Sequence, residues 1–265
     1  MNWSGSSPAA IRKRSSVNWI GSSVFGTRSR EGPSDGVSVK ARTRDLVITI
    51  DGPAGAGKST VAELLARRLG FRRIDTGALY RALAWAVNAA GLRAEDGPAL
   101  RAVLHRTRVE LRGERVLVDG RDVTPEIRTP EVSELTSRLT MLGPVREKMT
   151  PLQRELAAAG AVVLEGRDTG SVVCPDADVK FYLDADLDTR AARRQADLRE
   201  QGVVMDLAGV KQDLAQRDRQ DMERPLAPLV KAEGAVVVDT SGLGLEEVVD
   251  AMLKNVERFL CCTER

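Results

Sequence analysis

Residue types that characterise several protein classes are scarce in this chain of 265 residues. Aromatic residues make up only 3%, and Ala, Leu, Arg and Val dominate, which favours a helix-rich α/β fold over an all-β sandwich. The single histidine, His105, excludes a multi-histidine metal site and leaves a Ser-His-Asp triad only one residue to use. We assign His105 no role. No apolar run approaches the roughly 20 residues of a membrane-spanning helix.

Cysteine is also rare, and its placement argues against a disulfide framework. The three cysteines are Cys174, Cys261 and Cys262, with no C-x-x-C spacing, and adjacent cysteines rarely pair with each other. A chain of this length can bury a sizeable core without such bridges. We therefore expect a reducing compartment and a cytoplasmic location.

Charge divides the chain into a leader and a body. Residues 1–44 contain eight Lys/Arg, two acids and ten serines, whereas residues 45–265 contain 32 Lys/Arg and 36 Asp/Glu. The leader has no hydrophobic period and too little apolar surface to fold, so we expect disorder. A flexible or mis-assigned extension is favoured over an organelle transit peptide or a basic arm for nucleic acid or acidic lipid. The acidic body predicts no nucleic-acid partner.

From residue 45 onward, short β-rich runs alternate with amphipathic segments, which predicts a parallel sheet covered by helices on both faces. Strands are expected at 46–50 and 71–75, and strands of the buried type at 161–164, 179–183 and 235–238. Helices are expected at 61–69, 77–90, 130–159 (two, broken near Gly143-Pro144), 186–200, 206–219 and 245–259. Residues 109–119 read as a β-hairpin around Gly113-Glu114, inserted between βαβ units.

A phosphate-binding loop follows the first strand and opens the first helix. The pattern G-x-x-x-x-G-K-[ST] is met at every fixed position by Gly52, Pro53, Ala54, Gly55, Ala56, Gly57, Lys58 and Ser59, with Thr60 next. Glycines let backbone N–H groups wrap a phosphate chain, Lys58 reaches the β and γ phosphates, and a hydroxyl can ligate Mg²⁺. ATP with Mg²⁺ is therefore the expected cofactor. The chain lacks the N-K-x-D of guanine readers, so a small-molecule kinase is the favoured class.

Three further clusters contain the residues that a second phosphate would need. They are D-T-G-A-L-Y-R at 75–81, E-G-R-D-T-G-S-V-V-C-P-D at 165–176 and R-D-R-Q-D-M-E-R at 217–224. The first two follow strands, so they should share the carboxyl edge of the sheet with the phosphate-binding loop. Each supplies arginine, which suits phosphate recognition. The two Asp-Thr-Gly triplets also match aspartic proteases, but those enzymes are β-rich.

With the loop, these clusters resemble the bacterial-type cytidylate (CMP/dCMP) kinase family of P-loop nucleoside monophosphate kinases, over roughly residues 45–260. The resemblance implies transfer of the γ-phosphoryl of ATP to CMP or dCMP by a monomeric kinase domain at 45–265. Its core would span 45–105 and 143–265, its acceptor-binding insert with a small antiparallel sheet about 106–142, and its short helical lid about 190–224.

Residue roles carried over by position complete this hypothesis. Lys58, Arg167, Arg193 and Arg224 would be catalytic, the last two from the lid side at the transferring phosphates. Arg81 and Arg167 would grip the acceptor phosphate, Asp168 and Arg146 would read cytosine with Ser137, and Arg217 and Asp221 would hold the sugar. Thr76, Gly77 and Tyr80 would line the pocket. Thr169 and Cys174 stand where apolar or aromatic residues are expected in the family, and Ser59 or Thr60 could supply the Mg²⁺ hydroxyl.

The chemistry of cytosine agrees with these roles, and alternatives stay open. Cytosine presents an N4 amino donor to a carboxylate such as Asp168, whereas uracil presents an acceptor oxygen there. The nearest alternatives are a kinase for UMP, AMP, dTMP or shikimate, or a nucleotide-binding regulator without turnover. Residues 217–224 could instead form a solvated helix face, and Ser137 a plain surface serine.

Overall fold

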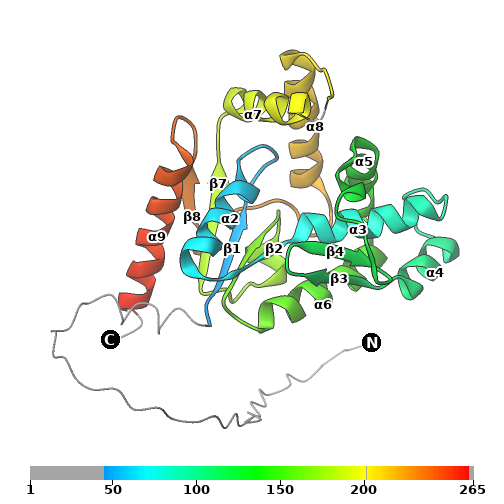
Figure 1. Ribbon diagram of the computed structural model, residues 1–265, viewed down its shortest axis with the longest axis horizontal. Helices are drawn as coiled ribbons and strands as arrows, with labels where there is room; N and C mark the ends of the chain where they lie inside the picture. Colours follow the sequence, from blue (N-terminus) through cyan, green and yellow to red (C-terminus); the bar gives the residue numbers. More distant parts are fainter. Residues whose placement is uncertain (1–44, 201, 263–265) are drawn as a thin grey trace, which may run out of the picture. The chain divides into compact units, whose positions relative to one another are not determined.

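The computed structural model describes residues 45–200 and 202–262, so the basic leader at 1–44 lies outside the described residues. Five strands form a sheet in the order β2-β6-β1-β7-β8, and every neighbouring pair is parallel. These strands are β1 (Val47–Asp51), β2 (Arg72–Asp75), β6 (Val162–Glu165), β7 (Val179–Asp184) and β8 (Val236–Asp239) (Figure 1). The predicted α/β fold with a parallel sheet is confirmed.

Helices cover both faces of this sheet, as the alternating pattern predicted. On one face, α2 (Lys58–Leu69) and α9 (Leu245–Cys262) pack over β1 and β7, with Leu65 and Met252 fully buried. On the other face, α3 (Thr76–Ala89) and α6 (Gly143–Ala158) pack against β2 and β6. Successive residues of β6 show the two layers: Val163 packs with α2 and α9 on one face, and Leu164 packs with α3 and α6 on the other. No described helix is both long and apolar enough to cross a membrane.

A second, antiparallel sheet lies between α3 and α6 in the chain. It contains β3 (Val109–Arg112), β4 (Arg115–Val118) and β5 (Arg121–Asp122), in that order. The first two strands are the predicted hairpin. Helix α4 (Pro98–Arg106) and α5 (Pro130–Leu139) flank it in sequence, with a 3₁₀ turn η1 (Glu126–Arg128) between β5 and α5. Helix α4 and strand β5 were not predicted. The predicted break between two helices at Gly143-Pro144 is confirmed by the start of α6.

Two helices and one short turn complete the described fold. Helices α7 (Leu187–Glu200) and α8 (Leu207–Glu223) pack against each other, in the upper part of Figure 1. A π-helical turn, η2 (Thr169–Val173), follows β6. One prediction of burial is wrong: the run at 235–238 was expected to form a buried strand, but β8 is the edge of the sheet and Val237 is 52% exposed.

Candidate active site

The phosphate-binding loop has a shape that only glycine allows at its first position. Gly52 has φ 149°, and a Cβ there would lie 2.0 Å from the backbone oxygen of Leu183 in β7. Gly55 has φ 77° and lies against the backbone of Arg190 in α7. These close approaches pack the loop tightly between the sheet and α7, with its backbone turned toward the start of α2.

Lys58, the first residue of α2, is buried at the centre of this loop. Its side chain crosses the loop, and Nζ donates to the Pro53 carbonyl oxygen at 2.6 Å. Burial, and secondarily the nearby positive charge of Arg167, lower the pKa of Lys58 to about 7. An ammonium held this way gains most from an anionic ligand, because the ligand replaces the lost hydration.

Ser59 and Glu165 form a polar pair beside the lysine. The Ser59 hydroxyl donates to Glu165 Oε2 at 2.6 Å, and Glu165 ends β6, the strand next to β1. Burial raises the pKa of Glu165 to about 7. Ser59 and Thr60 are both exposed, so exposure does not distinguish the two hydroxyls as Mg²⁺ ligands. The carboxylate was part of a sequence cluster but received no predicted role; its place at the end of a buried strand was the available signal.

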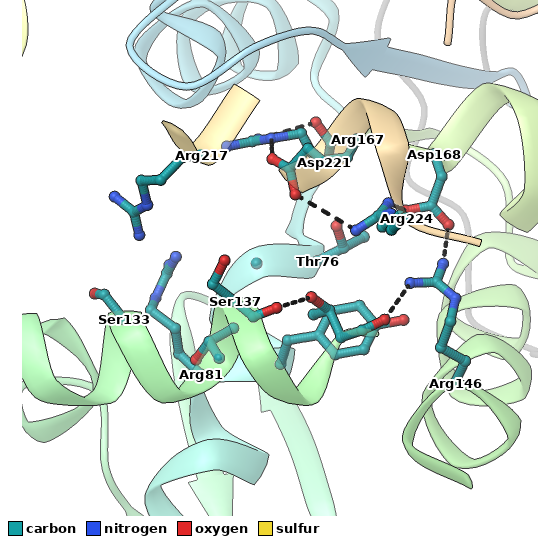
Figure 2. A pocket seen from close by; sticks show the side chains of 15 residues that line it. Thr76, Arg81, Ser133, Ser137, Arg146, Arg167, Asp168, Arg217, Asp221 and Arg224 are labelled. Atoms are coloured by element: carbon teal, nitrogen blue, oxygen red, sulfur yellow. Dashed lines mark hydrogen bonds and ion pairs between the residues drawn. The ribbon is translucent and has the colours of Figure 1, made fainter. Parts of the chain in front are cut away.

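Two cavities lie at this edge of the sheet: the phosphate-loop cavity, lined by Gly55, Lys58 and Ser59 among others, and the acceptor cavity. The acceptor cavity brings together all ten residues predicted to bind the acceptor. It is lined by Thr76, Gly77, Tyr80, Arg81, Ser133, Thr136, Ser137, Thr140, Arg146, Gly166, Arg167, Asp168, Arg217, Asp221 and Arg224 (Figure 2). Five arginines and two aspartates supply its charges, so the cavity favours an anionic ligand. Ser133, Thr136 and Thr140 were not predicted; they line the cavity from α5 and the residue that follows it.

Asp168 is held between two buried arginines. One carboxylate oxygen accepts from Arg146, and the other accepts from Arg224 Nη2 at 3.1 Å. The Arg146 guanidinium also lies over the Tyr80 ring, 5.9 Å from its centroid. All three charged side chains are at most 9% exposed. Their positions are therefore fixed before a ligand binds, and each Asp168 oxygen keeps a lone pair for another donor.

Two more arginines that line the cavity also pair with carboxylates: Arg167 with Asp221, and Arg81 with Asp75. Asp221, on α8, accepts from Arg167 Nε at 2.8 Å and lies 3.6 Å from Arg224 Nη1. Asp75 caps α3 by accepting from the Ala78 N–H, and its second oxygen accepts from Arg81 Nη2 at 3.0 Å. The Arg167–Asp221 pair thus joins the segment after β6 to α8 (Figure 2), whereas the Asp75–Arg81 pair joins the end of β2 to α3.

Arg193 and Arg224, predicted to act together at the phosphates, line different cavities. Arg193 lines the phosphate-loop cavity and donates to the Thr240 hydroxyl and backbone oxygen at 2.9 and 2.8 Å. Arg224 follows the last residue of α8, and its side chain turns inward to Asp168, in the acceptor cavity only. Its role at the phosphates stays a prediction that this position does not favour.

The two cavities adjoin each other. Six residues line both of them, and three of these are arginines: Arg81, Arg167 and Arg217. Lys58 and Ser59 line only the loop side, whereas Asp168 and Arg146 line only the other side. A ligand in each cavity would therefore meet the other at a junction of positive charge.

Asp51 is a buried carboxylate that the sequence reasoning missed. It ends β1 and accepts three hydrogen bonds: from the Thr169 N–H, the Thr169 hydroxyl and the Gly170 N–H, at 2.8, 2.8 and 2.7 Å. Burial raises its pKa, although these donors oppose the shift. Asp51 thereby joins the residue before the phosphate-binding loop to the turn that follows Asp168. The signal was Thr169, a polar residue where an apolar one was expected.

Comparison with known proteins agrees with this geometry. The family model described as cytidylate kinase matches residues 48–258. A cytidylate kinase of Symbiobacterium thermophilum is 48% identical over 221 residues, covering 82% of this chain and 98% of that protein. Those of Carboxydothermus hydrogenoformans and a Geobacillus species are 44% and 46% identical, covering 80% of this chain and 97% and 96% of theirs. The chain therefore belongs to the cytidylate kinase family.

Proposed function

We propose that the two adjoining cavities are the donor and acceptor sites of one phosphoryl transfer. The chain has cytidylate kinase activity, the phosphorylation of CMP and dCMP, and as a nucleotide kinase it uses ATP. The phosphate-loop cavity would hold the ATP phosphates, and the arginine-lined cavity would hold the nucleoside monophosphate. The observation that carries this assignment is the shared boundary of the cavities, formed by Arg81, Arg167 and Arg217.

On the donor side, backbone N–H groups of the loop and Lys58 would bind the β and γ phosphates. Ser59 and Glu165 would hold a Mg²⁺ ion on this side of the site. The observation in favour is that Glu165 Oε1 is buried without a hydrogen-bond partner among the described residues, with Arg73 Nη1 3.6 Å away. Mg²⁺ would neutralise charge on the phosphate chain, and protein ligands would be few, since no group of three or more His, Cys, Asp or Glu suited to a metal occurs among the described residues.

On the acceptor side, Asp168 would accept from the cytosine amino group, and Arg146 would donate to O2 or N3. The two arginines at Asp168 hold its carboxylate in one orientation before the base arrives. Uracil would place O4, an acceptor, against this carboxylate, so O4 would be buried facing another acceptor, and an unpaired buried group costs about 1–3 kcal/mol. Base selection would thus rest on one prepositioned carboxylate.

Transfer itself would depend on placement and on charge neutralisation. The acceptor phosphate would lie at the junction, where Arg81 and Arg167 reach it, and Arg193 would face the donor phosphates from α7. Phosphoryl transfer needs little covalent help from the protein, and positioned cations stabilise the charge on the transferring group. Helices α7 and α8 would be the lid, and the segment with β3, β4, β5 and α5 the acceptor-binding insert.

A coupled ADP-release assay over CMP, dCMP, UMP, AMP, dTMP and shikimate tests the proposal. We expect turnover with CMP and dCMP, at least about 100-fold above the other acceptors in kcat/KM, because a site built for a substrate donor rejects analogues strongly. Omitting Mg²⁺ should abolish turnover. Preference for another acceptor would overturn the reading of Asp168. A monomeric state and a cytoplasmic location stay predictions, to be checked by light scattering and fractionation.

A further inference from the structure

Asp218 is a charged residue of the 217–224 cluster for which the acceptor cavity has no use. It lies on α8 between Arg217 and Arg219, is only 7% exposed and does not line the acceptor cavity. Its Oδ1 instead accepts a hydrogen bond from the backbone N–H of Ala54 at 3.1 Å. Ala54 is the third residue of the phosphate-binding loop. A residue of α8 therefore contacts the donor side directly.

Arg190, on α7, completes this contact from the other helix. Its Nη1 donates to Asp218 Oδ2 and also to the Ala54 carbonyl oxygen, the latter at 3.1 Å. Its Nε donates to the Ala185 carbonyl oxygen at 2.9 Å. Both charged side chains are 10% exposed. The N–H and the C=O of Ala54 are thus both bonded by one buried ion pair.

Packing around Ala54 is equally close. Its side chain belongs to a hydrophobic cluster with Ala191, Leu198, Val210 and Leu214, all from α7 and α8. The next residue is Gly55, and a Cβ there would lie 3.0 Å from the Arg190 backbone oxygen. The apolar contacts of Ala54 and the close approach at Gly55 therefore come from the same two helices that supply Arg190 and Asp218.

We propose that Arg190 and Asp218 are positioning residues for the ATP phosphates: they fix the peptide groups of Ala54 and so the direction of the loop N–H groups that follow it. This inference rests on the assignment of ATP to the phosphate-binding loop. It adds a coupling, because the helices that supply Arg193 and Arg217 to the cavities also hold the loop. Loss of the Arg190–Asp218 pair would turn the Ala54 peptides and weaken ATP binding, and neither of these two residues lines the acceptor cavity.

A purely structural role would make a different prediction. A second ion pair, Asp188 to Lys211 at 2.7 Å, also bridges α7 and α8, but Asp188 is 77% exposed. Neither residue lines the cavity at the phosphate-binding loop. Asp188→Asn is therefore a matched control: it removes a carboxylate that joins the same two helices and leaves Ala54 untouched.

The test compares KM values for the two substrates. Asp218→Asn and Arg190→Lys should each raise KM for ATP about tenfold, since a small misplacement of binding groups has effects of this size or larger. KM for CMP should change less than about twofold, as should both values in Asp188→Asn. Direct titration of ATP into wild type separates the two hypotheses: no ATP binding by wild type would contradict the proposed donor site, whereas equal ATP affinity in wild type and Asp218→Asn would overturn the positioning role.

A second variant covers the case in which the single changes unfold the protein. Removing one partner of a buried pair is strongly destabilising, but replacing both with apolar residues of similar volume is often neutral. Arg190→Met combined with Asp218→Leu should therefore fold, with a higher melting temperature than either single variant. We expect its KM for ATP to stay raised about tenfold, because the Ala54 peptides still lack partners. Recovery of a wild-type KM for ATP in this double variant would overturn the proposal.

Discussion

The phosphate-binding loop and the acceptor cavity are built in opposite ways. The loop is one continuous segment whose shape depends on backbone geometry, with glycines at φ 149°, 77° and 85°. The acceptor cavity collects side chains from α3, α5, α6, the turn after β6 and α8, and ion pairs hold them. The loop should therefore fail when atoms are added to its backbone, and the acceptor cavity when a charge is removed. Lys58 is the exception in the loop, because it acts through the charge of its side chain and not through backbone geometry.

Lys58→Ala should have the largest effect on activity. We expect turnover to fall at least about 100-fold, because charge contacts made in the transition state are worth this much. The fold should persist. The buried ammonium has a pKa lowered from 10.5 to about 7, so its contribution to stability is present above pH 10.5 and is lost as the pH falls toward 7. The melting temperature of Lys58→Ala minus that of wild type should therefore increase as the pH falls from 10.5 to 7.

Turnover and thermal unfolding, measured on the same preparations, check this prediction. Lys254→Ala is the matched control, because Lys254 is an exposed lysine of α9 and lines neither cavity. Retention of more than about a tenth of wild-type turnover in Lys58→Ala would contradict a transition-state role.

Gly52→Ala should have the largest effect on stability. The new Cβ would lie 2.0 Å from the Leu183 backbone oxygen, and neither backbone can yield without breaking strand pairing. We expect a loss of roughly 3 kcal/mol or more in the free energy of unfolding. Gly91→Ala gives the scale of conformational strain alone, since Gly91 has φ 66° and nothing lies within 4 Å of its Cβ position. That variant should lose about 1 kcal/mol. Urea denaturation measures both, and equal losses would contradict a role for the close approach.

The contrast between the regions also explains what the sequence could predict. The loop could be predicted from local spacing, because its motif lies in eight consecutive residues, although the contacts that hold it come from β7, α7 and α8. The acceptor cavity depends on contacts between distant segments, such as Asp168 with Arg224, and these became predictable only through the family resemblance. The resemblance named the residues that line the cavity. It did not predict that Asp168 pairs with two arginines or that Arg224 turns away from the loop cavity.

Other features lacked a local signal. Asp51 ends a strand directly before the loop motif, yet its carboxylate accepts hydrogen bonds from a turn 118 positions later in the chain. Helix α4 is short, with nine residues, and follows a run of charged and glycine residues that obscures its period. The exposure of β8 depends on its place in the strand order, because a β-branched run has the same composition at the edge as at the centre. Strand order is a property of the assembled sheet.

Asp168→Asn should break the acceptor side while leaving the loop intact. The amide oxygen can still accept from cytosine N4, whereas the amide NH₂ can donate to uracil O4 but faces Arg146 or Arg224. We expect kcat/KM for CMP to fall by a factor equivalent to about 1–3 kcal/mol, the worth of one base-edge contact. The loss should lie near the upper end of this range, because two arginines lose their charged partner. The value for UMP should hold or rise.

Measurement of kcat/KM for CMP and UMP in wild type and variant decides whether Asp168 reads the base. Asp176→Asn, a change of an exposed aspartate after the same turn, should alter neither value. An equal fall for both substrates in Asp168→Asn would show that this carboxylate only holds Arg146 and Arg224 in place.

Thr169→Val should have a smaller effect, on the connection between the two regions. The Thr169 hydroxyl is one of three donors to Asp51, and valine has the same shape without the donor. A hydrogen bond to a charged group contributes about 1.5–3 kcal/mol, and the two backbone donors remain, so we expect a loss near about 1.5 kcal/mol by urea denaturation. Thr49→Val is the matched control, since the Thr49 hydroxyl is buried without a partner among the described residues. Its replacement should leave stability unchanged or raised, because an unsatisfied polar group is removed. Equal losses in the two variants would show that the shape of the site, and not the bond to Asp51, determines the cost.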